Sequence, residues 1–113
     1  MEFLFDYQKF CATTAVYDKE VEREYLVNGL AAEAGEVAGK FAKLVRDTDL
    51  GKTNTINATD ALAIAKELGD CCWFIARLCD YIGWDFVDVI DLNRVKLSKR
   101  KAEDSLHGSG DER

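Results

Sequence analysis

Two pairs of carboxylates, each with a spacing of three residues, are the side chains in this sequence best suited to chemistry. Glu33 and Glu36 form the first pair, and Glu67 and Asp70 form the second. This spacing puts both members of a pair on one face of a helix, about one turn apart. Two such helices packed side by side would gather four oxygen ligands. Oxygen ligands suit a hard divalent cation such as Mg²⁺, which usually also binds substrate phosphates.

The position of Glu33 separates these acids from an ordinary solvated face. Steps of three and four residues link an apolar stripe formed by Leu26, Leu30, Val37, Phe41 and Leu44, and Glu33 fills the missing position. A charge within an apolar stripe is costly unless it is paired or binds metal. Both pairs also lie in the middle of their expected helices, so no helix N-terminus explains them. We therefore interpret the four acids as metal ligands.

A face of cationic and amide side chains follows near the end of the chain. Asn93, Lys96 and Arg100 recur at steps of three and four, so they share one side of a helix. Together with Lys40, they are our candidates for binding substrate phosphates through charge-assisted hydrogen bonds. The alternative is that these cations only stabilise a helix C-terminus. Phe5, Tyr17 and Trp73 are candidates for stacking on a base, although aromatic residues at helical spacing usually belong to a core.

The composition predicts an all-α protein with one domain over residues 1–113. The chain lacks proline and is rich in good helix formers. Turn-forming residues fill 47–57, Gly83 is a stop signal, and the glycine-rich tail 107–113 should be flexible. We expect four helices. The first covers about 2–16, and the second covers about 20–46 with a break near Asn28 and Gly29. The third runs from a cap at Asn57 or Thr59 to 82, and the fourth covers about 85–103.

Two helices carry further apolar stripes that we expect to face a core. The first consists of Leu62, Ala65, Leu68, Cys72, Ile75, Cys79 and Ile82. The second consists of Phe86, Val89, Ile90, Leu92 or Asn93, and Leu97. Gly35 and Gly39 lie in a run of small residues around the first acid pair, which suggests close approach by another helix or by a ligand.

Charge and hydropathy exclude several classes of function. The net charge of −6 argues against binding to nucleic acid, which needs a basic face. No apolar run is long enough to span a membrane, and the N-terminus lacks a signal peptide, so we expect a soluble, cytoplasmic protein. The four cysteines form no C-x-x-C pair, and we expect them to be reduced and buried.

The sequence resembles the MazG-like all-α nucleoside triphosphate pyrophosphohydrolases. The resemblance rests on E-x-x-E at Glu33 and Glu36, E-x-x-D at Glu67 and Asp70, and N-x-x-K-x-x-x-R from Asn93 to Arg100. The phrases GLAAEAGEV at 29–37 and KELGD at 66–70 also fit, and the similarity extends from about residue 24 to the end. No motif in the first helix matches a base-contacting pattern.

The resemblance implies a four-to-five-helix bundle that assembles as a homodimer or homotetramer. It implies hydrolysis of a nucleoside triphosphate between the α and β phosphates, giving a monophosphate and pyrophosphate. The expected cofactor is Mg²⁺, with Mn²⁺ as a substitute, held by the four acids. Such an ion would neutralise phosphate charge and lower the pKa of the attacking water. We expect Glu36, with Glu33, to be catalytic, Glu36 taking a proton from that water or orienting it. The role would be nucleotide-pool house-cleaning or control of dNTPs.

Three other readings remain open at this stage. A non-enzymatic helical binding or regulatory module would tolerate acid-to-amide changes and would assemble without metal. A phosphoribosyl-ATP pyrophosphohydrolase-like enzyme would share the fold and the type of bond cleaved. A di-iron carboxylate bundle is disfavoured, because that class uses Glu-x-x-His pairs and the single histidine, His107, lies near the chain end.

Overall fold

The computed structural model describes residues 2–103, and all the regular structure in this range is helical, which confirms the all-α prediction. The tail predicted to be flexible, 107–113, lies outside the described residues. The elements are α1 (Glu2–Thr13), η1 (Lys19–Val21), α2 (Glu22–Asp47), α3 (Leu50–Thr53), α4 (Ala58–Ile82) and α5 (Phe86–Ala102).

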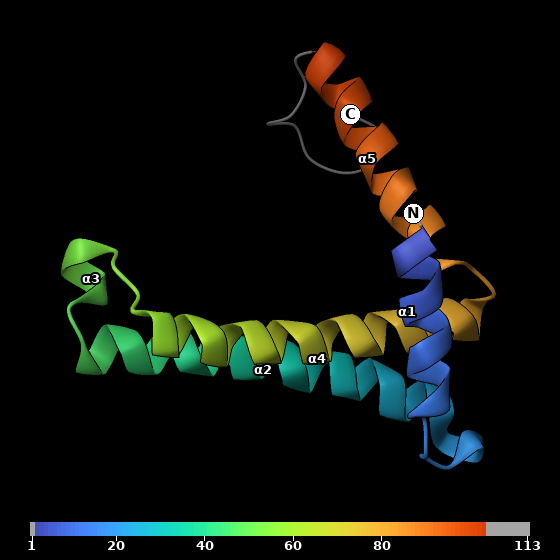
Figure 1. Ribbon diagram of the computed structural model, residues 1–113, viewed down its shortest axis with the longest axis horizontal. Helices are drawn as coiled ribbons and strands as arrows, with labels where there is room; N and C mark the ends of the chain where they lie inside the picture. The colour runs from blue at the N-terminus through green and yellow to red at the C-terminus, as the bar shows by residue number, and fades with distance from the viewer. Residues whose placement is uncertain (1, 104–113) are drawn as a thin grey trace.

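The helices form two arms that meet at one end of the molecule (Figure 1). The long antiparallel helices α2 and α4 lie side by side and make the first arm, with α3 at its far end. At the near end, α1 crosses this pair, and α5 projects away from it. The radius of gyration is 17.2 Å, whereas a compact chain of this length has about 13 Å. One chain therefore leaves much of its helical surface uncovered.

The ends of α4 follow the signals in the sequence. The Asn57 side chain accepts a hydrogen bond from the Asp60 backbone N–H at 2.9 Å, which caps the start of the helix. Gly83 adopts the left-handed conformation with φ of +79°, and the Trp84 N–H returns to the Cys79 carbonyl at 2.9 Å. Glycine reaches this conformation at little steric cost, so the predicted stop at Gly83 is confirmed.

Three local predictions were wrong. The first helix ends at Thr13 rather than near 16, where the Thr13 and Thr14 hydroxyls bond back to the carbonyls of Phe10 and Cys11. The segment 47–57 is not all loop, because it contains α3. Helix α2 continues through Gly29 without a break. The glycine instead leaves room for the Phe74 ring of α4.

At Gly29, a side chain of α4 comes close to the backbone of α2. A Cβ atom built on Gly29 would lie 2.1 Å from Cε1 of Phe74, well inside contact distance. By contrast, a Cβ at Gly35 or Gly39 would meet nothing within 4 Å. No other part of the described chain therefore packs closely against those two glycines, and the close approach of a neighbouring helix lies about two to three turns earlier in α2. Approach by a ligand at Gly35 and Gly39 stays a prediction.

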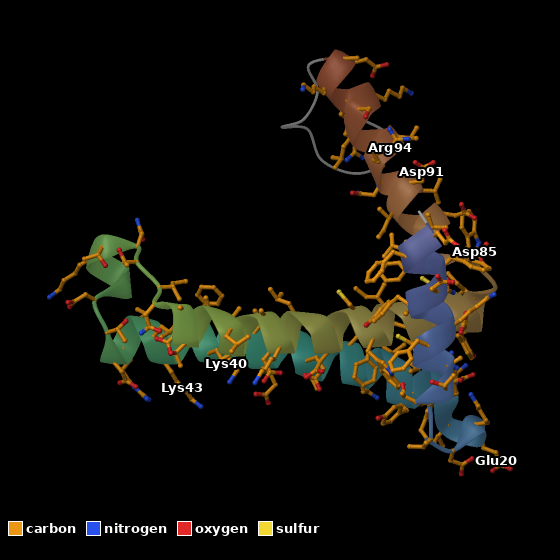
Figure 2. The ribbon with its side chains drawn as sticks, viewed as in Figure 1. Glu20, Lys40, Lys43, Asp85, Asp91 and Arg94 are labelled. Atoms are coloured by element: carbon orange, nitrogen blue, oxygen red, sulfur yellow. The ribbon has the colours of Figure 1, made fainter. Side chains whose placement is uncertain are left out.

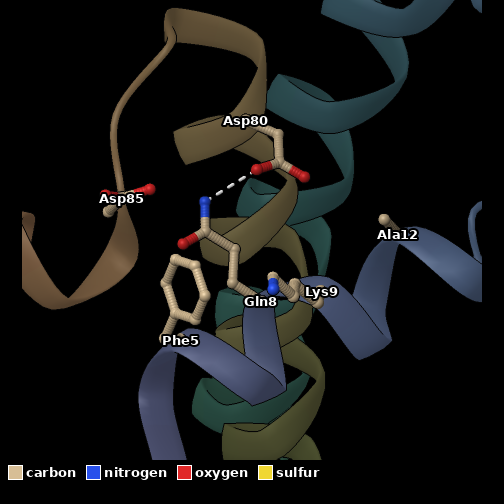
Figure 3. Close-up of a pocket in the computed structure, with 6 residues that line it drawn as sticks. All are labelled: Phe5, Gln8, Lys9, Ala12, Asp80 and Asp85. Atoms are coloured by element: carbon tan, nitrogen blue, oxygen red, sulfur yellow. Dashed lines mark hydrogen bonds between the residues drawn. The ribbon is translucent and has the colours of Figure 1, made fainter. Parts of the chain in front are cut away.

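The core lies where α1, α4 and α5 meet. It is built around Cys11, Ala76, Cys79 and Phe86, all buried. The buried Gln8 ties the three helices together (Figure 3): its amide donates to Asp80 at 2.7 Å and to the Trp84 carbonyl at 3.0 Å. Its oxygen accepts from the Phe86 N–H at 2.6 Å. Because Asp85 makes no side-chain cap, Gln8 supplies the acceptor at the start of α5.

The predicted core stripe of α4 is wrong in its first half. Leu62 and Leu68 are 58% and 50% exposed, and Cys72 is exposed as well. Around Leu62 and Leu68, α2 is the only helix of the described chain beside α4, so one face is covered and the other is not (Figure 1). Ile82 is also exposed. Within α4, the buried residues are Ile64, Phe74, Ala76, Arg77 and Cys79, and of these only Cys79 belongs to the predicted stripe.

The predicted inward face of α5 is buried only at its start. Phe86 is buried and Val89 is partly buried, but Ile90, Leu92 and Leu97 are exposed. This helix contacts α1 and α4 near their junction and then projects into solvent (Figure 1). An uncovered apolar helix face of this kind usually marks an interaction surface.

None of the helices in the described part of the chain combines the length and apolar character needed to cross a membrane.

Candidate active site

Three of the four predicted acids come together at the middle of the long arm. Glu33 of α2 and Glu67 and Asp70 of α4 can each offer one carboxylate oxygen, and these oxygens lie within 4.8 Å of one another. The antiparallel packing of α2 and α4 brings the centres of the two helices together, and with them the acids. Glu36 is exposed one turn further along α2, outside this cluster.

The cluster is electrostatically strained without a cation. Burial, together with the nearby Asp70, Glu67 and Glu36 carboxylates, raises the pKa of Glu33 above its usual range. The Lys40 ammonium lies 3.8 Å from Glu67 and offsets part of this charge. The pKa of the neighbouring Cys71 thiol is also raised, first by burial and then by Glu33. Such crowding favours a bound positive charge.

The donor set fits a hard divalent cation. All three ligand groups are carboxylates, the type that Mg²⁺ and Mn²⁺ favour. Opposite ligands of a Mg²⁺ ion are about 4.2 Å apart, given metal–oxygen distances near 2.1 Å. The largest separation allowed by the cluster exceeds this by only a few tenths of an ångström, which a small rotation of a carboxylate would close. Glu36, one turn away, could join after a change of rotamer.

The predicted phosphate-binding face of α5 is not at this site. Asn93 is exposed, Lys96 is partly buried and Arg100 is buried, but α5 contacts α1 and α4 and not α2. Figure 2 shows the divergence: Lys40 lies on the long arm, whereas Arg94 lies on the projecting helix. Of the four predicted phosphate ligands, only Lys40 is beside the acids in the same chain.

An open cleft of about 380 Å³ begins at the acids and extends toward the junction with α1. Glu33 and Asp70 form its acidic end. The other lining residues are Thr14, which directly follows α1, Tyr25 of α2, and Trp73 and Phe74 of α4. Sequence reasoning proposed Trp73 but missed the other three. The available signal was spacing, since Trp73 and Phe74 follow Asp70 by three and four residues.

The other two aromatic candidates have different places. Tyr17 does not line the cleft but contacts residues that do: its ring stacks on Tyr25 with centroids 4.8 Å apart and meets Trp73 edge-on at 6.3 Å. Phe5 lines a separate hollow around Gln8, with the Lys9 ammonium 4.3 Å from the centre of its ring (Figure 3). Asp80 in that hollow is bonded to Gln8 and to Arg77, so it has structural partners.

Buried polar groups hold Tyr17 in place. Arg77 is buried and donates to the Tyr17 hydroxyl from Nε at 3.2 Å and from Nη2 at 3.1 Å. The Tyr17 hydroxyl in turn donates to Glu22, and this hydrogen bond is the main reason that the pKa of Glu22 is lowered. Arg77 also pairs with Asp80. This network fixes the Tyr17 ring against the cleft residues and links α2, α4 and the turn after α1.

The all-α fold and its central carboxylate cluster define a helical protein with a candidate cation site beside an aromatic cleft. The family model described as MazG nucleotide pyrophosphohydrolase domain matches residues 21–103. The chain therefore belongs to the MazG nucleotide pyrophosphohydrolase family, as its motifs indicated. It is also similar to the Gene 37 protein of Mycobacterium phage L5, at 36% identity over 113 residues that cover 95% of this chain and 96% of the relative. No solved structure matches it significantly.

Proposed function

We propose that the protein is a Mg²⁺-dependent nucleoside triphosphate pyrophosphohydrolase that forms a monophosphate and pyrophosphate. The observation that carries the proposal is the order of groups along the long arm. The aromatic cleft, the acids and Lys40 follow one another on α2 and α4. Lys40 lies seven residues beyond Glu33 and Tyr25 eight residues before it, which is about 10–12 Å along the helix in each direction. A nucleotide has the same order of base, α-phosphate and distal phosphates.

Each acid has a role in this proposal. Glu33, Glu67 and Asp70 would hold the cation, with Glu36 as a fourth ligand or as the proton acceptor. The cation would neutralise charge on the phosphate oxygens and favour ionisation of a nearby water. Glu36 suits proton transfer because it is exposed and one helical turn from the cluster. Lys40 would contact the β or γ phosphate and stabilise the leaving pyrophosphate.

We propose further that the working form is a homodimer or homotetramer. The exposed apolar side chains on α4 and α5, among them Leu62, Leu68 and Leu92, support this, as does the large radius of gyration. Substrate binding by Asn93, Lys96 and Arg100 requires α5 of a second copy, because α5 of the same chain does not reach α2. Assembly would then bring the predicted phosphate-binding residues of α5 to the acids of a neighbouring copy.

The test is a pyrophosphate-release assay with the eight common NTPs and dNTPs, dUTP and an oxidised guanine nucleotide. We expect release of pyrophosphate and monophosphate in Mg²⁺ or Mn²⁺, and none after chelation. A preference for deoxynucleotides or for the oxidised nucleotide would indicate control of the dNTP pool or house-cleaning. A folded protein with no turnover on any of them would refute the proposal for these substrates, and phosphoribosyl-ATP would then be assayed.

A further inference from the structure

The direction of α5 is set at its base. Within the described chain, α5 meets only α1 and α4, near their junction, and projects from there (Figure 1). From Phe86 to Lys99 the helix extends about 20 Å, at 1.5 Å per residue. A tilt of roughly 10° at the base would therefore move Lys99 by about 3 Å. The predicted phosphate ligands Asn93, Lys96 and Arg100 lie on the part of α5 that would move.

The buried amide of Gln8 holds that base. Its oxygen accepts from the Phe86 N–H at 2.6 Å, and its nitrogen donates to the Trp84 carbonyl at 3.0 Å and to Asp80 at 2.7 Å (Figure 3). An amide has one donor end and one acceptor end, so only one orientation of the amide satisfies all three contacts. If the amide turned over, two donors would face each other at Phe86, and the hydrogen bond that holds the start of α5 would be lost.

Asp80 determines which way this amide points. A carboxylate offers acceptors at both oxygens, so it requires the nitrogen end of Gln8. One Asp80 oxygen accepts from Gln8, and the other accepts from the buried Arg77. Arg77 also donates to the Tyr17 hydroxyl through Nε and Nη2, which holds its guanidinium in place. A chain of directed hydrogen bonds therefore runs from Tyr17 to the first turn of α5.

We infer that Asp80 is a positioning residue for the reaction, because it orients the Gln8 amide and thereby sets the direction of α5. The inference rests on the proposed function, in which the polar face of α5 binds phosphates in a second copy. Stability alone does not explain the charged pair. The Asp80 side chain is 38% exposed and the Arg77 side chain is 6% exposed, and apolar residues of similar size in place of a buried ion pair are often equally stable. The charged pair supplies direction, which apolar packing lacks.

Asp80→Asn tests this role, since it keeps the shape of the side chain but replaces one acceptor by a donor. The new amide has one oxygen, so it accepts fully from Arg77 or from Gln8 but not from both. The hydrogen bond to the guanidinium is charge-assisted and stronger. The new nitrogen should therefore face Gln8 and displace its amide. Adding Arg77→Met removes the competition, so the double variant should recover the direction of α5.

Asp85→Asn is the matched control. Asp85 lines the same hollow as Asp80, but its side chain caps no backbone N–H of α5 (Figure 3). The same change of acid to amide should therefore leave α5 in place. A variant of Gln8 extends the test: Gln8→Leu removes the amide altogether and should displace α5 as well. It takes the place of Asp80→Asn if that variant does not fold.

Double electron–electron resonance measures the direction of α5 without requiring turnover. Spin labels are attached at Lys43→Cys on the long arm (Figure 2) and at Lys99→Cys on α5. The two cysteines that are not buried, Cys71 and Cys72, are replaced by serine. Dilution with an excess of unlabelled protein leaves only pairs within one chain.

We expect Asp80→Asn to shift or broaden the distance distribution by about 3 Å or more, which corresponds to a tilt of roughly 10°. Asp85→Asn and the double variant should keep the distribution of the unmodified protein. Turnover is measured on the same substitutions in the chain without labels. A displacement of about 1 Å can cost about 100-fold in rate, so Asp80→Asn should lose at least about tenfold in kcat/KM. The double variant should recover turnover, which a general loss of stability would not allow.

An unchanged distance distribution in Asp80→Asn would overturn the inference. A double variant as displaced as Asp80→Asn would also overturn it, because competition for one oxygen would not be the cause. Full turnover with a displaced α5 would remove Asp80 from the reaction. An unmodified protein that hydrolyses no nucleotide would refute the proposed function instead, and the distances would still decide whether Asp80 directs α5.

Discussion

Gly29 gives the sharpest test of how the two long helices carry the site. Alanine at this position would put its Cβ 2.1 Å from Cε1 and 2.4 Å from Cζ of Phe74. Carbon atoms in contact prefer about 3.5–4.0 Å, so the ring must withdraw by roughly 1.5 Å. Phe74 is 8% exposed and is packed against Tyr25 and Trp73, so it has little room to move.

The expected loss of stability follows from two opposing terms. Overpacking of a core usually costs about 1–3 kcal/mol. Replacing glycine by alanine inside a helix stabilises the folded state by up to about 1 kcal/mol. Gly29→Ala should therefore lose about 1–2 kcal/mol overall, and its melting temperature should fall by about 5–10 °C for a domain of this size. Gly35→Ala is the matched control, because a Cβ there meets nothing within 4 Å. It should be neutral or slightly stabilising.

The assay is thermal unfolding followed by circular dichroism, at one protein concentration so that any assembly contributes equally. A double-mutant cycle with Phe74→Leu isolates the clash, since Gly29→Ala should become nearly harmless once the ring is gone. If Gly29→Ala melts at or above the temperature of Gly35→Ala, the close approach of α2 and α4 at this point is wrong. The position of the aromatic cleft beside the acids would be wrong with it.

Three further predictions concern the acids and the helix junction. Glu67→Gln and Asp70→Asn should each lose at least about 100-fold in turnover, the upper range for changes around a metal. Both variants should also lose the rise in melting temperature that we expect from Mg²⁺. The control Asp91→Asn, on α5, should retain both the turnover and this rise. Full activity in Glu67→Gln or Asp70→Asn would contradict the metal site. Glu33→Gln should melt higher than the unmodified protein at pH 7 in chelator, because the raised pKa of Glu33 makes its carboxylate unfavourable in the folded state above that pKa. The difference in melting temperature should disappear as the pH falls below about 4, where the Glu33 carboxyl is protonated in both the folded and the unfolded state. A difference that stays constant with pH would refute the electrostatic cause. Gln8→Leu should lower the free energy of unfolding by about 1–3 kcal/mol in denaturant titration, because it leaves the buried Phe86 N–H without an acceptor; no change would show that another group caps α5.

The sequence alone determined the long helices, the ends of α4 and the types of residue that gather at the candidate site. Helix periodicity, the Asn57 cap and the Gly83 stop are local signals, so they could be read without knowing what packs against them. The acids were visible because Glu33 interrupts an apolar stripe and because two pairs share one spacing. These features also carried the family resemblance, which the comparison confirmed.

The tertiary structure decided which of those residues meet. It placed Glu33 with Glu67 and Asp70 but left Glu36 one turn away, and it directed α5 away from the acids. It also chose the buried face of α4, which the apolar pattern could not do because this helix is apolar on more than one side. The cleft formed by Thr14, Tyr25, Trp73 and Phe74 joins three segments that are distant in sequence. Spacing within one helix fixes a face, whereas the angle and register between helices come from packing, as at Gly29 and Phe74.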